Sequence, residues 1–120
     1  MEGALGAGNE TMWGGDGNDR LYGGVLQYGG AGDDGIRASS DRDRIYGGAG
    51  NDVSYAGGAA ERAYGGDGSD SLWGGQGNDL IFGDFANSPR GAGDYIDGGS
   101  GDDDLSGGAG RAWIYGGTGA

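Results

Sequence analysis

Residues 65–82 read GGDGSDSLWGGQGNDLIF, which is two nine-residue units in tandem with the same internal pattern. Each unit follows G-G-x-G-x-D-x-U-x, where U is a large aliphatic residue, Leu72 in the first unit and Ile81 in the second. Three more full copies, and one copy with Ser54 at the U position, lie at residues 14–22, 29–37, 98–106 and 47–55, in that order. A pattern that returns in phase indicates a repeat fold in which each unit stacks on its neighbours.

Weaker units between these copies keep the nine-residue phase but have lost glycines or the aspartate. They lie at residues 5–13, 38–46, 56–64, 89–97 and 107–115. Two six-residue segments, 23–28 and 83–88, interrupt the phase, and we expect both to be insertions. We therefore expect residues 1–120 to form a single repeat array, a fragment of a larger protein.

The composition departs far from that of an ordinary globular protein. Glycine supplies 35 of the 120 residues and the hydrophobic share is 34%, too little aliphatic material for a conventional two-layer core. The net charge of -12 disfavours nucleic acid as a partner and favours cations. The chain has no Cys and no His, so we expect no thiolate or imidazole metal site and no enzymatic activity. No apolar run approaches the ~20 residues of a membrane span.

The spacing within a unit brings oxygen atoms together. Glycine at positions 1, 2 and 4 lets the backbone take positive φ and turn tightly, so carbonyl oxygens converge without β-carbon clashes. The aspartate at position 6 adds a carboxylate at the end of the turn. Carbonyl and carboxylate oxygens suit Ca²⁺ better than a softer metal, and Mg²⁺ is the weaker candidate because it demands strict octahedral geometry.

The candidate metal ligands follow from this spacing. The carboxylate candidates are Asp19, Asp34, Asp43, Asp52, Asp70, Asp79, Asp94 and Asp103. Weaker candidates are Glu10 and Glu61, which stand where aspartate is expected, and Asp41, which lies in a turn without glycines. The glycines expected to contribute backbone carbonyls are Gly14, Gly15, Gly17, Gly29, Gly30, Gly32, Gly47, Gly48, Gly50, Gly65, Gly66, Gly68, Gly74, Gly75, Gly77, Gly98, Gly99 and Gly101.

Positions 7 to 9 of each unit alternate in direction, as a short strand requires. A three-residue strand is stable only when stacked on copies above and below, about 4.8 Å away. We expect the U side chains to point inward, namely Leu21, Ile36, Ile45, Leu72, Ile81, Ile96, Leu105 and Ile114.

Position 9 is often aromatic, and we expect its rings to form outward-facing columns. The rings are Trp13, Tyr22, Tyr46, Tyr55, Tyr64, Trp73, Phe82 and Tyr115. Two interpretations stay open: the rings stack to stabilise neighbouring strands, or they form a stripe that binds carbohydrate or a partner.

The units resemble the haemolysin-type calcium-binding repeats of the RTX (repeats-in-toxin) family, and the resemblance covers nearly the whole chain. It implies an all-β fold, a right-handed parallel β-roll of stacked 18-residue coils with Ca²⁺ held between turns on the same side. It also implies a secreted, extracellular protein that is exported by type I secretion and folds outside the cell. Repeats of this family often adjoin a protease, lipase, epimerase or toxin domain.

On that scheme, turns two units apart share an ion. Five sites are then flanked by two aspartates, at the pairs 34/52, 52/70, 70/94, 19/43 and 79/103, and we expect about five to nine Ca²⁺ ions in all. Stacked carboxylates repel one another and glycine is costly to order, so calcium is expected to supply the folding free energy. The alternative function is a carbohydrate- or partner-binding adhesion module, and self-association through open roll ends also stays open.

Overall fold

The computed structural model describes residues 2–5, 11–23, 25–38, 42–83, 93–108 and 111–118. This part of the chain contains strands and turns, which confirms the prediction of an all-β fold. It includes no helix that is long and apolar enough to cross a membrane. The strands are β1 (Glu2–Leu5), β2 (Thr11–Asp16), β3 (Arg20–Tyr22), β4 (Leu26–Ala31), β5 (Gly35–Arg37), β6 (Arg44–Ala49), β7 (Val53–Gly57), β8 (Arg62–Asp67), β9 (Ser71–Gln76), β10 (Leu80–Phe82), β11 (Gly93–Ser100), β12 (Asp104–Ser106) and β13 (Arg111–Tyr115).

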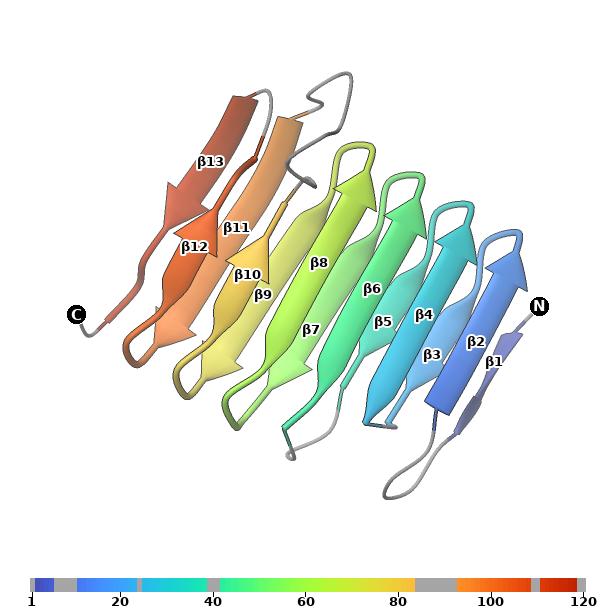
Figure 1. Ribbon diagram of the computed structural model, residues 1–120, viewed down its shortest axis with the longest axis horizontal. Coiled ribbons are helices and arrows are strands. Elements are labelled where there is room, and N and C mark those ends of the chain that lie inside the picture. Colours follow the sequence, from blue (N-terminus) through green and yellow to red (C-terminus); the bar gives the residue numbers. More distant parts are fainter. Residues whose placement is uncertain are drawn as a thin grey trace.

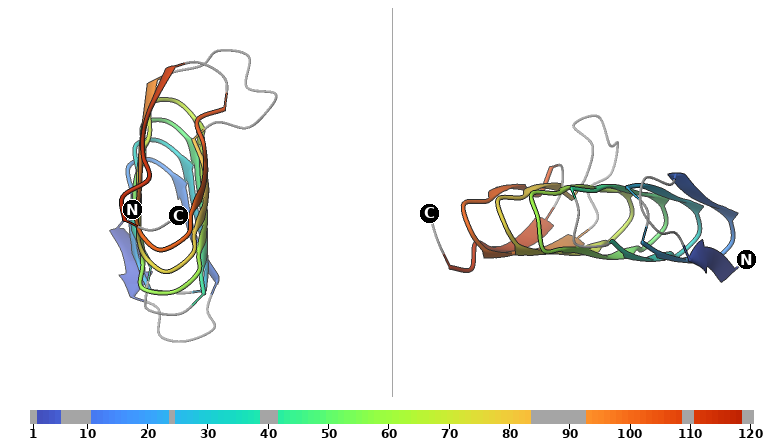
Figure 2. Two further views of the ribbon diagram at one scale, coloured as in Figure 1. Left: turned by 90° about the vertical axis from the view of Figure 1, so that its left-hand side faces the viewer. Right: turned by 90° about the horizontal axis from the view of Figure 1, so that it is seen from below.

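The described strands form two parallel sheets. The odd-numbered strands make a seven-stranded sheet in the order β1-β3-β5-β7-β9-β11-β13, which we call sheet A. The even-numbered strands make a six-stranded sheet in the order β2-β4-β6-β8-β10-β12, which we call sheet B. The chain crosses from one sheet to the other at each turn, so it winds as a flat solenoid (Figures 1 and 2).

Inward side chains from both sheets fill the space between the two layers. Burial alternates along each short strand, as in β3, where Leu21 is buried between exposed neighbours. The buried apolar residues are Met12, Leu21, Ile36, Ile45, Ala56, Ala63, Leu72, Ile81 and Ile96. The inward prediction is thus confirmed for most of the U positions, and Leu105 is partly buried. Ile114 stands in register with the inward Ile96 but is 45% exposed, because β13 is paired on one side only, with β11.

The register between coils shows where the repeat departs from 18 residues. The offset between stacked residues is 18 through the middle of the solenoid and 24 across the segment between β10 and β11. This is six residues more, as a six-residue insertion predicts. Its expected start at residue 83 is wrong, because Gly83 takes position 1 of the Asp94 turn, and residues 84–88 lie outside the described part of the chain.

The first expected insertion, residues 23–28, is instead a shortened repeat. Leu26, Gln27 and Tyr28 begin β4 and pair with both β2 and β6. The offset here falls to 15 residues, because the unit has lost three residues from its turn but kept its strand. Gln27 takes the inward position and is fully buried.

Glycine is required in the turns for two different reasons. At positions 2 and 4 the backbone has positive φ, for example 110° at Gly48 and 122° at Gly50, a region that residues with a β-carbon rarely adopt. The glycine at position 1, such as Gly47, is not among the residues with positive φ. The sequence-based expectation of positive φ is wrong at this position, where the requirement is space.

The predicted aromatic column has formed on sheet B. On sheet A it is interrupted, because Arg37 stands between Tyr22 and Tyr55, and among the described rings of that sheet only Tyr55 and Trp73 stack closely. On sheet B the rings of Trp13, Tyr28, Tyr46, Tyr64 and Phe82 stack with centroids 4.2 to 5.3 Å apart and planes within 10°. Such stacking adds to the stability of adjacent strands beyond the buried area. The ring faces inside the column are therefore covered by other rings, and mainly ring edges meet the solvent.

Candidate metal-binding turns

The turns lie along two edges of the solenoid. Those that follow β2, β4, β6 and β8, at the top of Figure 1, together with the one after β10, form the first turn edge. It carries Asp19, Asp34, Asp52, Asp70 and Asp94. Those that follow β5, β7, β9 and β11 form the second turn edge, which carries Asp43, Glu61, Asp79 and Asp103.

A ladder of hydrogen bonds connects the aspartates of the first turn edge. Each of these side chains is at most 2% exposed. The backbone N–H of each aspartate donates to Oδ1 of the aspartate in the next coil, over 2.8 Å for 19/34, 34/52 and 52/70 and 2.9 Å for 70/94. The ladder brings five buried carboxylates into one column with spacing set by the sheet.

The second oxygen of each carboxylate, Oδ2, points toward the first glycine of its own turn. A β-carbon on Gly29 would lie 2.5 Å from Asp34 Oδ2 and 2.5 Å from the carbonyl oxygen of Gly47 in the next coil. The same close approach to the aspartate of the turn recurs at Gly14, Gly47, Gly65 and Gly83. Two oxygens therefore converge in a space that is too small for a methyl group.

Half of the second turn edge repeats this arrangement. The backbone N–H of Asp79 donates to Oδ1 of Asp103 over 2.9 Å. A β-carbon on Gly74 would clash with Asp79 Oδ2 and lie 2.6 Å from the carbonyl oxygen of Gly98. These two turns match the five turns of the first edge.

The other half of the second turn edge differs at position 1. Alanine replaces glycine there, Ala38 in the turn of Asp43 and Ala56 in the turn of Glu61. Ala56 is fully buried and stands in β7 beside Gly74 of β9. Its methyl group takes up the space in which the other turns place two oxygens. The longer Glu61 side chain instead accepts a hydrogen bond at Oε1 from the N–H of Ala59, over 2.7 Å.

Comparison with known families agrees with this geometry. The model of the RTX calcium-binding nonapeptide repeat matches four times, at residues 5–25, 28–60, 55–87 and 91–120. The chain belongs to the RTX calcium-binding repeat family. Its repeats form a calcium-binding module, which is a structural rather than a catalytic unit. No curated protein and no solved structure matches the chain significantly.

The residues of the RTX turns fit a hard cation. Oδ2 of Asp34, Asp52, Asp79 and Asp103 is buried and accepts no hydrogen bond from the described residues. A buried carboxylate oxygen without a donor is costly, and a bound cation removes that cost. No group of three carboxylates gathers at one point in the described part of the chain, so an ion here must also draw on backbone carbonyls, as Ca²⁺ readily does.

Burial disfavours the charged form of several turn carboxylates. Burial raises the pKa of Asp34, and it raises the pKa of Asp52 to about 6, with the Asp34 and Asp33 carboxylates adding to the effect. Burial and then a hydrogen bond to Asp79 raise the pKa of Glu61 to about 8. Protons are thus favoured at these carboxylates when no other cation is present.

Most of the aspartate pairs expected from the sequence lie in adjacent turns of the same turn edge. The pairs 34/52, 52/70, 70/94 and 79/103 lie in adjacent turns. The pair 19/43 is wrong, because the shortened unit at 23–28 moves Asp19 to the first edge beside Asp34 and leaves Asp43 on the second. Five double-aspartate steps remain, with 19/34 in place of 19/43. Glu10 and Asp41 lie outside the described residues.

A second ladder on the outside of the RTX turns was missed in the sequence. Position 5 carries Asn18, Asp33, Asn51 and Ser69 on the first edge, and each side chain accepts a hydrogen bond from the backbone N–H of the next coil. Asn78 accepts one from Asp102 in the same way on the second edge. The recurrence of Asn, Asp or Ser at position 5 is the sequence signal for this ladder.

Proposed function

We propose that each complete turn of this module holds Ca²⁺ with the position-6 aspartates of adjacent coils and the backbone carbonyls of the turn glycines. The supporting observation is the buried Oδ2 of Asp34 and Asp52, which faces a neighbouring carbonyl and has no hydrogen-bond donor among the described residues. The ion supplies positive charge that neutralises the stacked carboxylates. The protein contributes the turn, the spacing and the exclusion of water.

On this proposal, the residue at position 1 decides which turns can bind Ca²⁺. Seven of the described aspartates have glycine at position 1 of their turn, five on the first edge and two on the second, although residues 84–92 of the Asp94 turn lie outside the described part of the chain. The turns of Asp43 and Glu61 have alanine there and are the weakest candidates. The five double-aspartate steps set the lower end of our expectation of about five to nine ions.

Calcium binding is proposed to drive folding of the module. The chain carries a net charge of -12, and stacking its buried carboxylates without a counter-ion is unfavourable. The core is one thin row of side chains from each sheet, which offsets little of the ~1–2 kcal/mol that ordering each backbone residue costs. Binding only to the folded state therefore shifts the equilibrium toward the roll.

This coupling suits a secreted bacterial protein. We propose that the chain stays unfolded at low calcium, leaves the cell by type I secretion and folds in calcium outside. The family of the repeat supports this assignment. Expression with a type I exporter tests it: the chain should accumulate in the medium, and retention in the cell would contradict it.

The stacking of the aromatic column on sheet B argues against the alternative that this column binds carbohydrate. A sugar ring packs against an open ring face, whereas Tyr28, Tyr46 and Tyr64 each have a ring stacked on both faces. The column is better explained as a stabilising feature of the sheet.

Substitution of a ligand aspartate tests the proposed sites. Asp52→Asn keeps an oxygen for the N–H of Asp34 but removes the charge from two adjacent steps, so we expect the loss of one or two bound ions in calorimetry. Asp104→Asn, an equal charge change at an exposed position on the face of sheet B, should leave the ion count unchanged. Equal counts for both variants would contradict the assignment.

A further inference from the structure

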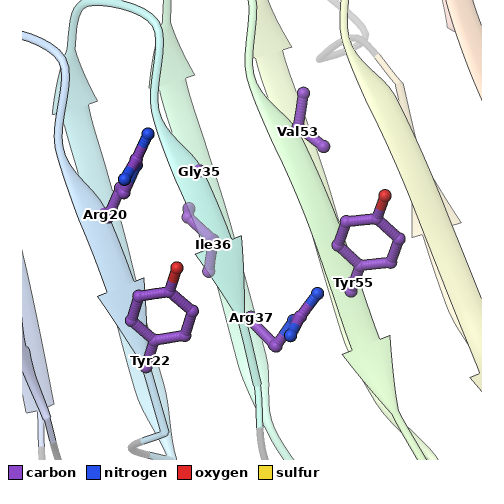
Figure 3. Close-up of a pocket in the computed structure, with 7 residues that line it drawn as sticks. All are labelled: Arg20, Tyr22, Gly35, Ile36, Arg37, Val53 and Tyr55. Atoms are coloured by element: carbon purple, nitrogen blue, oxygen red, sulfur yellow. The ribbon is translucent and has the colours of Figure 1, made fainter.

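The outward face of sheet A contains a cavity that the calcium-binding turns do not use. It measures about 110 Å³ and opens between the side chains of strands β3, β5 and β7. Its lining comprises Arg20, Tyr22, Gly35, Ile36, Arg37, Val53 and Tyr55, and Figure 3 shows Gly35 lying between Arg20 and Val53 with the two tyrosines on either side.

Gly35 forms this cavity and has no structural reason to be glycine. It sits at position 7 of its unit, in register with Arg20 and Val53 on the neighbouring strands. Its φ is not positive. A β-carbon there would meet only Arg20 Cγ, at an ordinary 3.9 Å. A glycine inside a strand weakens the strand and often marks the close approach of a ligand.

The cavity is positively charged although the chain is strongly acidic. Arg20 and Arg37 are exposed, and the lining of the cavity contains no acidic residue. The register partners of Arg37 are Tyr22 and Tyr55, whereas Arg20 has Glu2 of β1 as one partner. Guanidinium groups bind carboxylates through two parallel hydrogen bonds.

The two rings at the cavity are more exposed than the stacked tyrosines of sheet B. Tyr55 nevertheless lies between Arg37 of β5 and Trp73 of β9, whose ring stacks on it with centroids 4.9 Å apart, so it offers its hydroxyl and ring edge. Arg37 separates Tyr22 from Tyr55 and lies 5.4 Å from the centroid of the Tyr55 ring. Tyr22 and Tyr55 are 39% and 42% exposed. Their hydroxyls point to the same side in Figure 3, along the flanks of the cavity. Amphipathic rings beside a cation suit a ligand that has both apolar C–H surface and acidic groups.

We propose that this cavity receives a carboxylate of an acidic polysaccharide that lies along sheet A, with Arg20 and Arg37 supplying positive charge on either side of it and the hydroxyls of Tyr22 and Tyr55 contacting the sugar. The cavity is much smaller than the roughly 300–1,000 Å³ of pockets that enclose a small molecule, so it fits a group that projects from a larger ligand. An extended acidic peptide is a poorer fit, because β5 is paired on both sides and offers no free strand edge.

Binding to hyaluronan oligosaccharides in calcium tests this proposal, with dextran as the neutral glycan and poly-glutamate as the acidic peptide. Gly35→Thr fills the cavity while it keeps both arginines and favours the strand. Arg20→Ala with Arg37→Ala removes the cations. Arg44→Ala with Arg62→Ala is the matched control, because it makes the same charge change on the outward face of sheet B. Circular dichroism in calcium first shows that each variant folds, which separates this test from that of calcium-driven folding.

We expect the natural chain to bind hyaluronan and not dextran. Gly35→Thr and the Arg20/Arg37 pair should each weaken binding by about tenfold or more, while the Arg44/Arg62 pair keeps most of the affinity. Equal losses for both arginine pairs would show unspecific attraction and overturn the proposal. Absence of hyaluronan binding, unchanged binding by Gly35→Thr, or binding of poly-glutamate in place of hyaluronan would overturn it as well.

Discussion

At the scale of single residues, position 1 of the repeat separates complete turns from incomplete ones. Where it is glycine, as at Gly47, the carboxylate oxygen of the turn and a carbonyl oxygen of the next coil occupy the space beside its α-carbon. Where it is alanine, as at Ala56, a methyl group fills that space and the acidic residue is Glu61. The nine-residue pattern alone does not distinguish these glycines from those needed for positive φ, so their role became visible only in the structure.

Substitution at position 1 should therefore remove calcium without changing charge. In Gly47→Ala the new methyl group overlaps Asp52 Oδ2, and we expect the loss of at least one ion and a destabilisation of about 1–3 kcal/mol. Gly35→Ala is the control, since its β-carbon would meet only Arg20 Cγ, at an ordinary 3.9 Å. Calorimetry gives the ion count. A full count in Gly47→Ala would contradict the role assigned to this position.

The raised pKa values predict how the metal-free chain responds to pH. Asp52 and Glu61 have folded-state pKa values of about 6 and about 8, above their unfolded values, so the folded arrangement takes up protons. Its stability is then greatest at or below pH ~4 and falls as the pH rises through 6 and 8. Far-UV circular dichroism in metal-depleted buffer should show more β-structure at pH 4 than at pH 8.5. A constant or opposite trend would contradict the assigned shifts.

At the scale of strands and coils, the sequence predicted that the units stack, but it did not predict correctly where the nine-residue repeat is interrupted. The U positions predicted the inward side chains and the aspartates predicted the turns, because both recur at fixed positions within the nine-residue unit. Residues 23–28 were misjudged because the unit lost its aspartate and most of its turn, the parts by which a unit is recognised. Tyr28 at the strand end was the remaining signal, and it stacks between Trp13 and Tyr46.

One coil is weaker than its neighbours. β7 and β8 contribute Ser54 and Ala63 to the core, where adjacent coils contribute isoleucine and leucine. The Ser54 hydroxyl is buried without a hydrogen-bond partner among the described residues. Such a group typically costs about 1–3 kcal/mol.

Ser54→Ala should therefore stabilise the calcium-bound roll, by about 1 kcal/mol. Urea unfolding in saturating calcium measures the change, and Ser71→Ala, at a partly exposed outward position of β9, is the control. A destabilised Ser54→Ala would indicate that the hydroxyl has a partner and that this coil is not the weak one.

At the scale of the whole molecule, charge and shape lead to the same account. A flat two-sheet solenoid with a thin core has little apolar surface to bury, and its two edges concentrate carboxylates. On the proposed account such a protein needs a cation to fold. Its net charge of -12 would be balanced by about six calcium ions, within the expected range of about five to nine.

The most direct test of this account is a calcium titration of the metal-free chain at neutral pH, followed by far-UV circular dichroism and calorimetry on the same sample. We predict a coil-like spectrum that becomes β-rich in one cooperative transition as about five to nine ions bind. A spectrum that does not change with calcium, or saturation by one or two ions, would contradict the claim that stacked turns hold calcium and that calcium folds the roll.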